Sequence, residues 1–140
     1  MYHDIEKRGE YKSGFQNDTA FHYKIDLDAF EAQVKALAYN DDIVFTFDDG
    51  GSSALFLAAP ILEKYGRKGL FFICTQYIGQ PGFLTEKQIT ELENRGHLIG
   101  SHSHTHPSNM ASLSINEIRK EWGKSCGILE KILGKRIEIA

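Results

Sequence analysis

Residues 42–51 read DIVFTFDDGG, and this stretch decides the fold. Its first six residues form a short β-branched and aromatic run, which is typical of a strand buried on both faces. The run ends abruptly in two aspartates and two glycines, which favour a turn. A second run of this kind, GLFFICT at 69–75, follows after one helical stretch. Two such strands with a helix between them predict a parallel pair joined by a helical crossover, and hence an α/β fold.

Four helices are expected around these strands. The first begins at Asp26 or Asp28 and places four apolar residues on one face: Leu27, Phe30, Val34 and Leu37. The second covers about residues 53–65. The last two begin with capping boxes at 85–88 and 114–117, each flanked by apolar residues spaced as a hydrophobic staple.

Two further strands are expected, GHLIGSH at 96–102 and RIEIA at 136–140. Helices and strands therefore alternate from about residue 26 to the end of the chain. The first 25 residues show no clear periodicity, so we expect an irregular lead-in at 1–25 and one α/β unit at 26–140.

The composition is that of a single soluble globular domain, with 41% hydrophobic and 25% charged residues among 140. The net charge of −3 gives no basic surface, which argues against a nucleic-acid partner. No apolar run reaches the roughly 20 residues needed to span a bilayer. The polar N-terminus does not resemble an export signal. The compartment and the oligomeric state stay undecided.

Asp48 and Asp49 directly follow the first strand. They could simply form a solvated turn, because Asp and Gly are common turn residues. Two adjacent carboxylates repel each other, however, and a divalent cation relieves this repulsion if one of them is a ligand. The other carboxylate can then act as a general base. The pair also departs from the D-x-D-G-T pattern of haloacid-dehalogenase-type phosphatases, because the carboxylates are adjacent and no threonine follows the glycines.

Three histidines alternate in the stretch SHSHTHP at 101–107. Imidazole nitrogen is a common zinc ligand, and the proline argues that these residues lie on a loop. His102 with His104 gives the H-x-H of amidohydrolases, and all three evoke the metallo-β-lactamase run, although its acidic residue is missing. His102 with His106 gives H-S-x-x-H, which pairs naturally with an upstream Asp-Asp.

Both polar clusters follow predicted strands. The carboxyl ends of parallel strands meet at one edge, where the active sites of α/β folds are built. We therefore expect the two clusters to form one site.

The sequence resembles the polysaccharide deacetylases of carbohydrate esterase family 4, the nodulation-protein-B-homology domain. TFDDG at 46–50 is similar to the first family motif and HSHTH at 102–106 to the second, H-[S/T]-x-x-H. The intervening APILEKYGRKGLFFI and the approach LTEKQITELENRGHLIGSHSHTHP also resemble the family. These matches cover most of the chain from about residue 27.

The resemblance implies a role for each residue of the two motifs. Asp48 would be the general base, and Asp49, His102 and His106 would bind a divalent metal, with zinc favoured. Ser103 would brace the loop by hydrogen bonding, while His104 fills a variable position and points elsewhere or lines the cleft. The implied activity is that of a hydrolase acting on non-peptide carbon–nitrogen bonds. It removes acetyl groups from N-acetylated, or O-acetylated, carbohydrate by a metal-activated water.

The resemblance implies a distorted (β/α) barrel, and a full barrel runs to about 250 residues. The third to fifth family motifs, including the general-acid histidine, have no match, and by motif His3, His22 and His97 do not replace that acid. We therefore expect residues 26–140 to be the N-terminal portion of the domain, with parallel strands and helical crossovers. Gly51 replaces a common family proline and is expected to loosen its loop.

Two other functions stay open. The chain could be a catalytically incomplete module of this fold that binds carbohydrate or protein. It could also hydrolyse an amide that is not part of a sugar.

Overall fold

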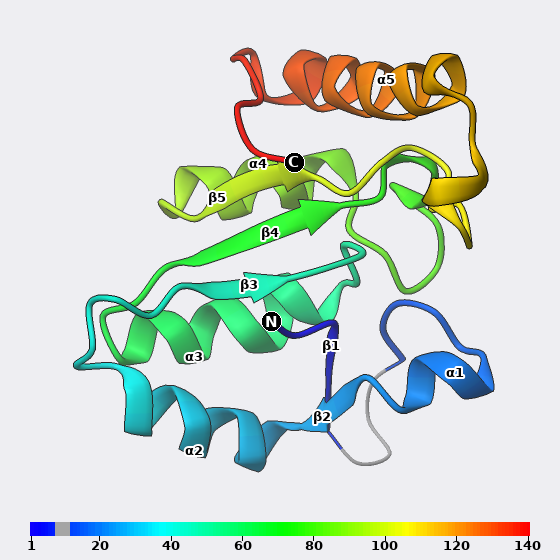
Figure 1. The fold of residues 1–140 in the computed structure, drawn as a ribbon. Coiled ribbons are helices and arrows are strands. Elements are labelled where there is room, and N and C mark those ends of the chain that lie inside the picture. The colour runs from blue at the N-terminus through cyan, green and yellow to red at the C-terminus, as the bar shows by residue number, and fades with distance from the viewer. Residues whose placement is uncertain (8–11) are drawn as a thin grey trace.

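The computed structural model describes residues 1–7 and 12–140 (Figure 1). Its strands are three to five residues long, and its helices range from single turns to nineteen residues. In chain order the elements are β1 (Asp4–Glu6), α1 (Asp18–Phe21), β2 (Lys24–Asp26), α2 (Leu27–Leu37), β3 (Phe45–Phe47), the π-helix η1 (Ala54–Ala58), α3 (Ala59–Lys64), β4 (Gly69–Ile73), the 3₁₀ turn η2 (Thr75–Tyr77), α4 (Glu86–Asn94), β5 (Leu98–Ser101), the 3₁₀ turn η3 (Met110–Ser112) and α5 (Ile115–Leu133).

A parallel sheet of order β3-β4-β5 forms the centre of the molecule, as Figure 1 shows. Helices connect its strands, so the predicted α/β crossovers are confirmed. Phe47 is in register with Phe71, and Ile73 with Ser101, so the residues after all three strands lie at one edge. That edge carries both polar clusters.

The predicted helix starts are confirmed. Asp26 caps α2 through its side chain, and both capping boxes are formed, at Thr85 for α4 and at Ser114 for α5. The helices and the sheet share one apolar core. Its largest fully buried aliphatic and aromatic side chains are Ile5, Phe30, Phe45, Phe47, Leu62, Phe71, Ile73, Leu84, Ile89, Leu92 and Leu129.

The expectation of an irregular lead-in at 1–25 is wrong for much of that segment, although residues 8–11 lie outside the described part. β1 and β2 form a parallel pair, and α1 precedes β2. Tyr2 also pairs with the edge of the central sheet, donating its N–H to the Thr46 carbonyl at 2.8 Å and accepting from the Asp48 N–H at 2.9 Å. Elements of three or four residues are too short to give a detectable period, so the pattern missed them.

Two predicted strands differ clearly from expectation: the first is shorter, and the last does not form. In the first, only Phe45–Phe47 pairs with a neighbour, and Val44 is 64% exposed. Residues 136–140 do not form a strand, although the Ile139 carbonyl accepts the Ser101 N–H at 2.9 Å beside β5. A single hydrogen bond aligns this segment with the sheet without making a ladder. Within the described ranges, every helix is too short or too polar to cross a membrane.

Candidate metal centre

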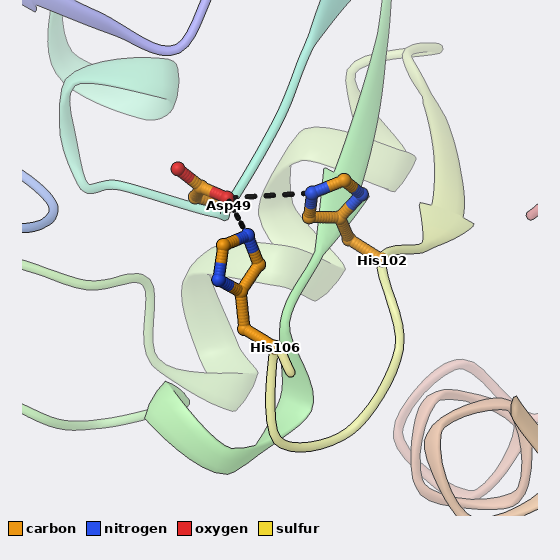
Figure 2. A group of neighbouring side chains, drawn as sticks. All are labelled: Asp49, His102 and His106. Atoms are coloured by element: carbon orange, nitrogen blue, oxygen red, sulfur yellow. Dashed lines mark ion pairs between the residues drawn. The ribbon is translucent and has the colours of Figure 1, made fainter. Parts of the chain in front are cut away.

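Asp49, His102 and His106 converge at the carboxyl edge of the sheet (Figure 2). Asp49 follows β3, His102 follows β5, and His106 lies on the loop beyond β5. Asp49 Oδ1 lies 3.4 Å from His102 Nε2 and 3.3 Å from His106 Nε2. In the described part of the chain, this is the one group of three such side chains that could hold a metal ion, and its ligand atoms lie within 4.8 Å of one another.

The backbone of the site is held in an uncommon conformation. Apart from glycines, the positive-φ residues among those described are Asp49 (φ 72°), Ser103 (φ 65°) and His106 (φ 56°). All three belong to the two motif loops, and two of them carry ligand atoms. Left-handed conformations of such residues cost about 1–3 kcal/mol each and persist where surrounding contacts impose them. This concentration of strain in the two loops is typical of a functional site.

The surroundings of Asp49 Oδ1 suit an atom that binds a cation. Asp49 is 7% exposed, and Oδ1 is the one fully buried side-chain oxygen or nitrogen without a hydrogen-bond partner among the described residues. The two imidazole nitrogens face this oxygen without hydrogen-bonding geometry. Ligands placed about 2.0–2.2 Å from a tetrahedral zinc are separated from one another by about 3.4 Å. The two Asp49–histidine distances match that separation, so the residues present fit a zinc-sized cation.

The two aspartates have opposite pKa shifts. Burial raises the pKa of Asp48, outweighing the attraction of His102 and His3. Burial also acts on Asp49, but His106 and His102 outweigh it and lower the pKa of Asp49. Environments that push the pKa values of two neighbouring carboxyl groups apart are typical of pairs with different catalytic roles.

The two outer histidines also differ. Burial lowers the pKa of His102, which favours the neutral imidazole that a metal requires. Contact with the Asp49 carboxylate raises the pKa of His106. Of the two rings, His106 is therefore the one whose protonated form Asp49 favours.

His104 points away from the centre, as expected. Its Nδ1 lies 2.9 Å from Thr75 Oγ1, and its carbonyl accepts the Gln76 N–H at 2.9 Å. Ser103 is buried, and its carbonyl accepts the Thr75 N–H at 3.3 Å. The loop is thus braced through the Ser103 backbone, while a bracing role for its hydroxyl stays a prediction.

His3 reaches the site although it matches no motif of the family. It lines a cavity of about 360 Å³ together with Asp49 and His106. The pairing of Tyr2 with β3 carries His3 to this edge. The sequence carries one signal for this placement, the opening MYHDI at 1–5, which resembles the YH segment that often precedes domains of the deacetylase family.

The lead-in forms much of the wall of that cavity. Its lining residues are His3, Phe15, Asn17, Thr19, Ala20, Tyr23, Asp49, His106 and Ser108. Phe15 packs edge-on against Tyr77 and Phe83, with ring centroids 4.7 and 5.1 Å away, and its ring lies 5.4 Å from that of His106. Tyr23 is 58% exposed, and its ring packs against that of His3 with the two centroids 4.9 Å apart. The cavity thus combines aromatic faces with ionisable groups.

The expectation that Gly51 loosens its loop is wrong. Gly51 is buried and forms a β-bridge with Phe83. A Cβ at this position would collide with the Asp4 carboxyl group and the Ser13 hydroxyl. Asp4 accepts hydrogen bonds from Ser13 and Ser53, so glycine here lets the lead-in close tightly over the Asp48–Asp49 turn.

A sequence model of the polysaccharide deacetylase family matches residues 38–140. The peptidoglycan-N-acetylglucosamine deacetylase of Bacillus cereus is 30% identical over 96 residues, covering 66% of this chain and 32% of that protein. YxkH of Bacillus subtilis is 39% identical over 64 residues, which are 46% of this chain and 23% of that protein. The chain thus spans less than a third of the length of either relative.

Solved structures show the same fold. A deacetylase of Streptococcus pyogenes, in complex with acetate, matches with a TM-score of 0.76 and 21% identity over 97% of this chain and 68% of that one. The carbohydrate esterase family 4 domain of a xylanase from the hindgut metagenome of Trinervitermes trinervoides matches with a TM-score of 0.59 and 31% identity. That match covers 67% of this chain and 44% of the other. The expected deacetylase-type α/β architecture is therefore confirmed.

Proposed function

The chain belongs to the polysaccharide deacetylase family, and we propose that it carries the metal centre of a hydrolase that removes acetyl groups from an N-acetylated carbohydrate. One observation carries this proposal. The imidazoles of His102 and His106 face a buried Asp49 oxygen that lacks a hydrogen-bond partner, next to a second buried aspartate. The relative named as a peptidoglycan-N-acetylglucosamine deacetylase supports an N-acetylated amino sugar as substrate, with an O-acetyl ester as the related alternative.

Zinc is the cation that we propose for the site. One carboxylate and two imidazoles are a common ligand set of catalytic zinc, which keeps a further position open for water or substrate. A cation held there supplies Lewis-acid polarisation of a carbonyl and lowers the pKa of water. Asp49, His102 and His106 would hold it, and partial burial lowers the pKa of His102, which favours the neutral ring that a metal ligand needs.

Asp48 and His3 are proposed to move the protons. Asp48 adjoins the ligand Asp49, and its raised pKa makes it a better base than an exposed aspartate. It takes the proton of the water that attacks the acetyl carbon. The carbon–nitrogen bond then breaks, and His3, which lines the same cavity, delivers a proton to the departing amine. The products are acetate and a free amino sugar.

The cavity wall is proposed to hold the sugar ring. Apolar faces of sugars pack on aromatic side chains, and Tyr23 exposes such a face beside His3. Phe15 closes the other part of the wall against His106. The substrate is thus placed between the lead-in and the metal centre.

Metal binding tests the centre directly. The wild-type chain is expected to bind one equivalent of zinc after dialysis, as measured by elemental analysis. Asp49→Ala, His102→Ala and His106→Ala should lose this metal. His104→Ala is the matched control within the same loop and should keep it, because the His104 side chain contacts Thr75 instead. Equal metal content in all four variants would contradict the ligand assignment.

Acetate release separates an enzyme from a binding module. The protein should release acetate from N-acetylated chitooligosaccharide, and Asp48→Asn should abolish this release while keeping the metal. If the wild type binds zinc and oligosaccharide without releasing acetate, the chain is a carbohydrate-binding module and not an enzyme. Turnover of a simple acetylated amine in preference to the oligosaccharide would instead favour a non-sugar amide.

A further inference from the structure

We infer that Glu121 is a positioning residue for the metal centre, fixing the loop between His102 and His106 from the neighbouring helix α5. This inference rests on the metal centre proposed above and adds a residue outside both motifs. Glu121 touches neither the ligand atoms nor the cavity. It acts through His104 and Thr105, two of the three residues between the two proposed histidine ligands.

Both carboxylate oxygens of Glu121 are used. Oε2 accepts the backbone N–H of His104 at 3.0 Å and that of Thr105 at 2.7 Å. Oε1 accepts the Thr105 hydroxyl at 2.9 Å. Three donors from two consecutive residues therefore end on one side chain. Hydrogen bonds to a charged acceptor are stronger than neutral ones, so this contact holds the middle of the loop firmly.

The loop needs such an anchor because of its backbone path. Ser103 and His106, on either side of the anchored pair, both have positive φ. The loop lies between β5 and η3, so neither a strand ladder nor a helix fixes it. If the anchor is removed, the strained residues can relax towards ordinary conformations, and His106 then moves away from Asp49.

Helix α5 is itself fixed to the strand that leads into the loop. Ser101, the last residue of β5, donates its hydroxyl to Ser125 Oγ at 2.7 Å. Glu121 lies one turn before Ser125, so both residues are on the same face of α5. This face of α5 therefore holds Ser101, which precedes His102, and also His104 and Thr105, which precede His106. The helix ties the positions of both imidazoles together.

The opposite side of the loop is held by η2. The His104 carbonyl accepts the Gln76 N–H, and Thr75 Oγ1 lies beside the His104 ring. Glu121 accepts from the backbone N–H groups that η2 does not reach. Loss of Glu121 therefore frees one side of the loop and leaves the other side in place.

Zinc affinity of the metal-free chain tests the inference. Glu121→Ala should raise the Kd for zinc about 10- to 100-fold, as is typical when residues that orient metal ligands are removed. Glu121→Gln should raise it less, because the amide oxygen can still accept both backbone N–H groups. The visible spectrum of bound Co²⁺ should change in both variants, since it reports the geometry of the ligands.

Glu130→Ala is the matched control. Glu130 lies on the same helix and also accepts a backbone N–H, from Ile137 at 3.2 Å, at a point outside the metal centre. It should lower the melting temperature of the metal-free chain without changing the zinc Kd or the cobalt spectrum. An effect of Glu130→Ala equal to that of Glu121→Ala would reduce Glu121 to a general stabiliser and overturn the inference.

The result also separates this inference from the proposed function. If the wild type binds zinc and both Glu121 variants bind it equally well, the positioning role is wrong while the metal centre stands. If the wild type binds no zinc, the metal centre and this inference both fall. If Glu121→Ala does not fold, the zinc affinity and the cobalt spectrum of Glu121→Gln test the inference in its place.

Discussion

Replacing Glu63 by glutamine should remove a pH-dependent part of the stability at the edge of the sheet opposite the metal centre. Glu63 accepts hydrogen bonds from Arg95 Nη2 at 2.7 Å and Nε at 3.0 Å. His97 Nδ1 accepts the Gly69 N–H at 3.0 Å, so its Nε2 carries the proton and donates to Glu63 at 3.2 Å. The Arg95 hydrogen bonds are the main reason why the pKa of Glu63 falls from 4.5 to about 2.

The magnitude follows from this pKa. A fall from 4.5 to about 2 corresponds to roughly 3 kcal/mol of differential stabilisation. The Glu63 side chain is 30% exposed, so solvent screening reduces the expected loss in Glu63→Gln to about 1–2 kcal/mol at neutral pH. Because the pKa is lower in the folded state, this stabilisation is fully present above pH 4.5. It is lost as the pH falls towards about 2.

Urea unfolding of wild type and Glu63→Gln at about pH 7 and about pH 3 measures the difference. Glu91→Gln is the matched control, because Glu91 contacts the same Arg95 at 3.4 Å from a more exposed position. Glu91→Gln should lower the free energy of unfolding by no more than about 0.5 kcal/mol. A Glu63→Gln difference that is as large at about pH 3 as at neutral pH would refute the reasoning, as would an equal effect of Glu91→Gln.

Three further predictions concern the metal centre and its lead-in. Zinc at about 100 times its Kd should stabilise the chain by about 2.7 kcal/mol, seen as a raised melting temperature that a chelator reverses; no shift would argue against a site in the folded chain. Gly51→Ala should cost about 1–3 kcal/mol in urea unfolding, because its Cβ collides with Asp4, and unchanged stability would contradict the tight closure. Tyr23→Ala should raise KM for the oligosaccharide several-fold with unchanged zinc content, whereas Tyr39→Ala, at an exposed tyrosine outside the cavity lining, should not.

The sequence predicted the grouping of Asp49, His102 and His106 because the information that places them is local. Asp48 and Asp49 follow an apolar run, and His102 and His106 follow another, so each cluster is tied to the end of a strand. Parallel pairing then brings strand ends to one edge whatever the details of packing. The capping boxes were equally predictable, since Thr85 and Ser114 bond to backbone groups only three residues away.

The lead-in could not be predicted in the same way. His3 reaches the centre only because Tyr2 pairs with β3, more than forty residues further along the chain. Backbone groups of Tyr2, Thr46 and Asp48 make this contact, so it leaves no pattern of side chains in the sequence. Gly51 shows the same limit, because its role depends on Asp4, which lies in another segment of the chain.

These contacts make the lead-in part of the site. The family model begins at residue 38, whereas His3, Phe15 and Tyr23 line the cavity from outside that match. The proposed ligands Asp49, His102 and His106 lie inside it. Metal binding should therefore be a property of the matched region, while the shape of the cavity depends on the lead-in. Asp4 accepts hydrogen bonds from Ser13 in the lead-in and from Ser53 in the matched region, and so connects these two parts of the chain. A change in this buried contact should therefore alter substrate preference more than it alters metal affinity.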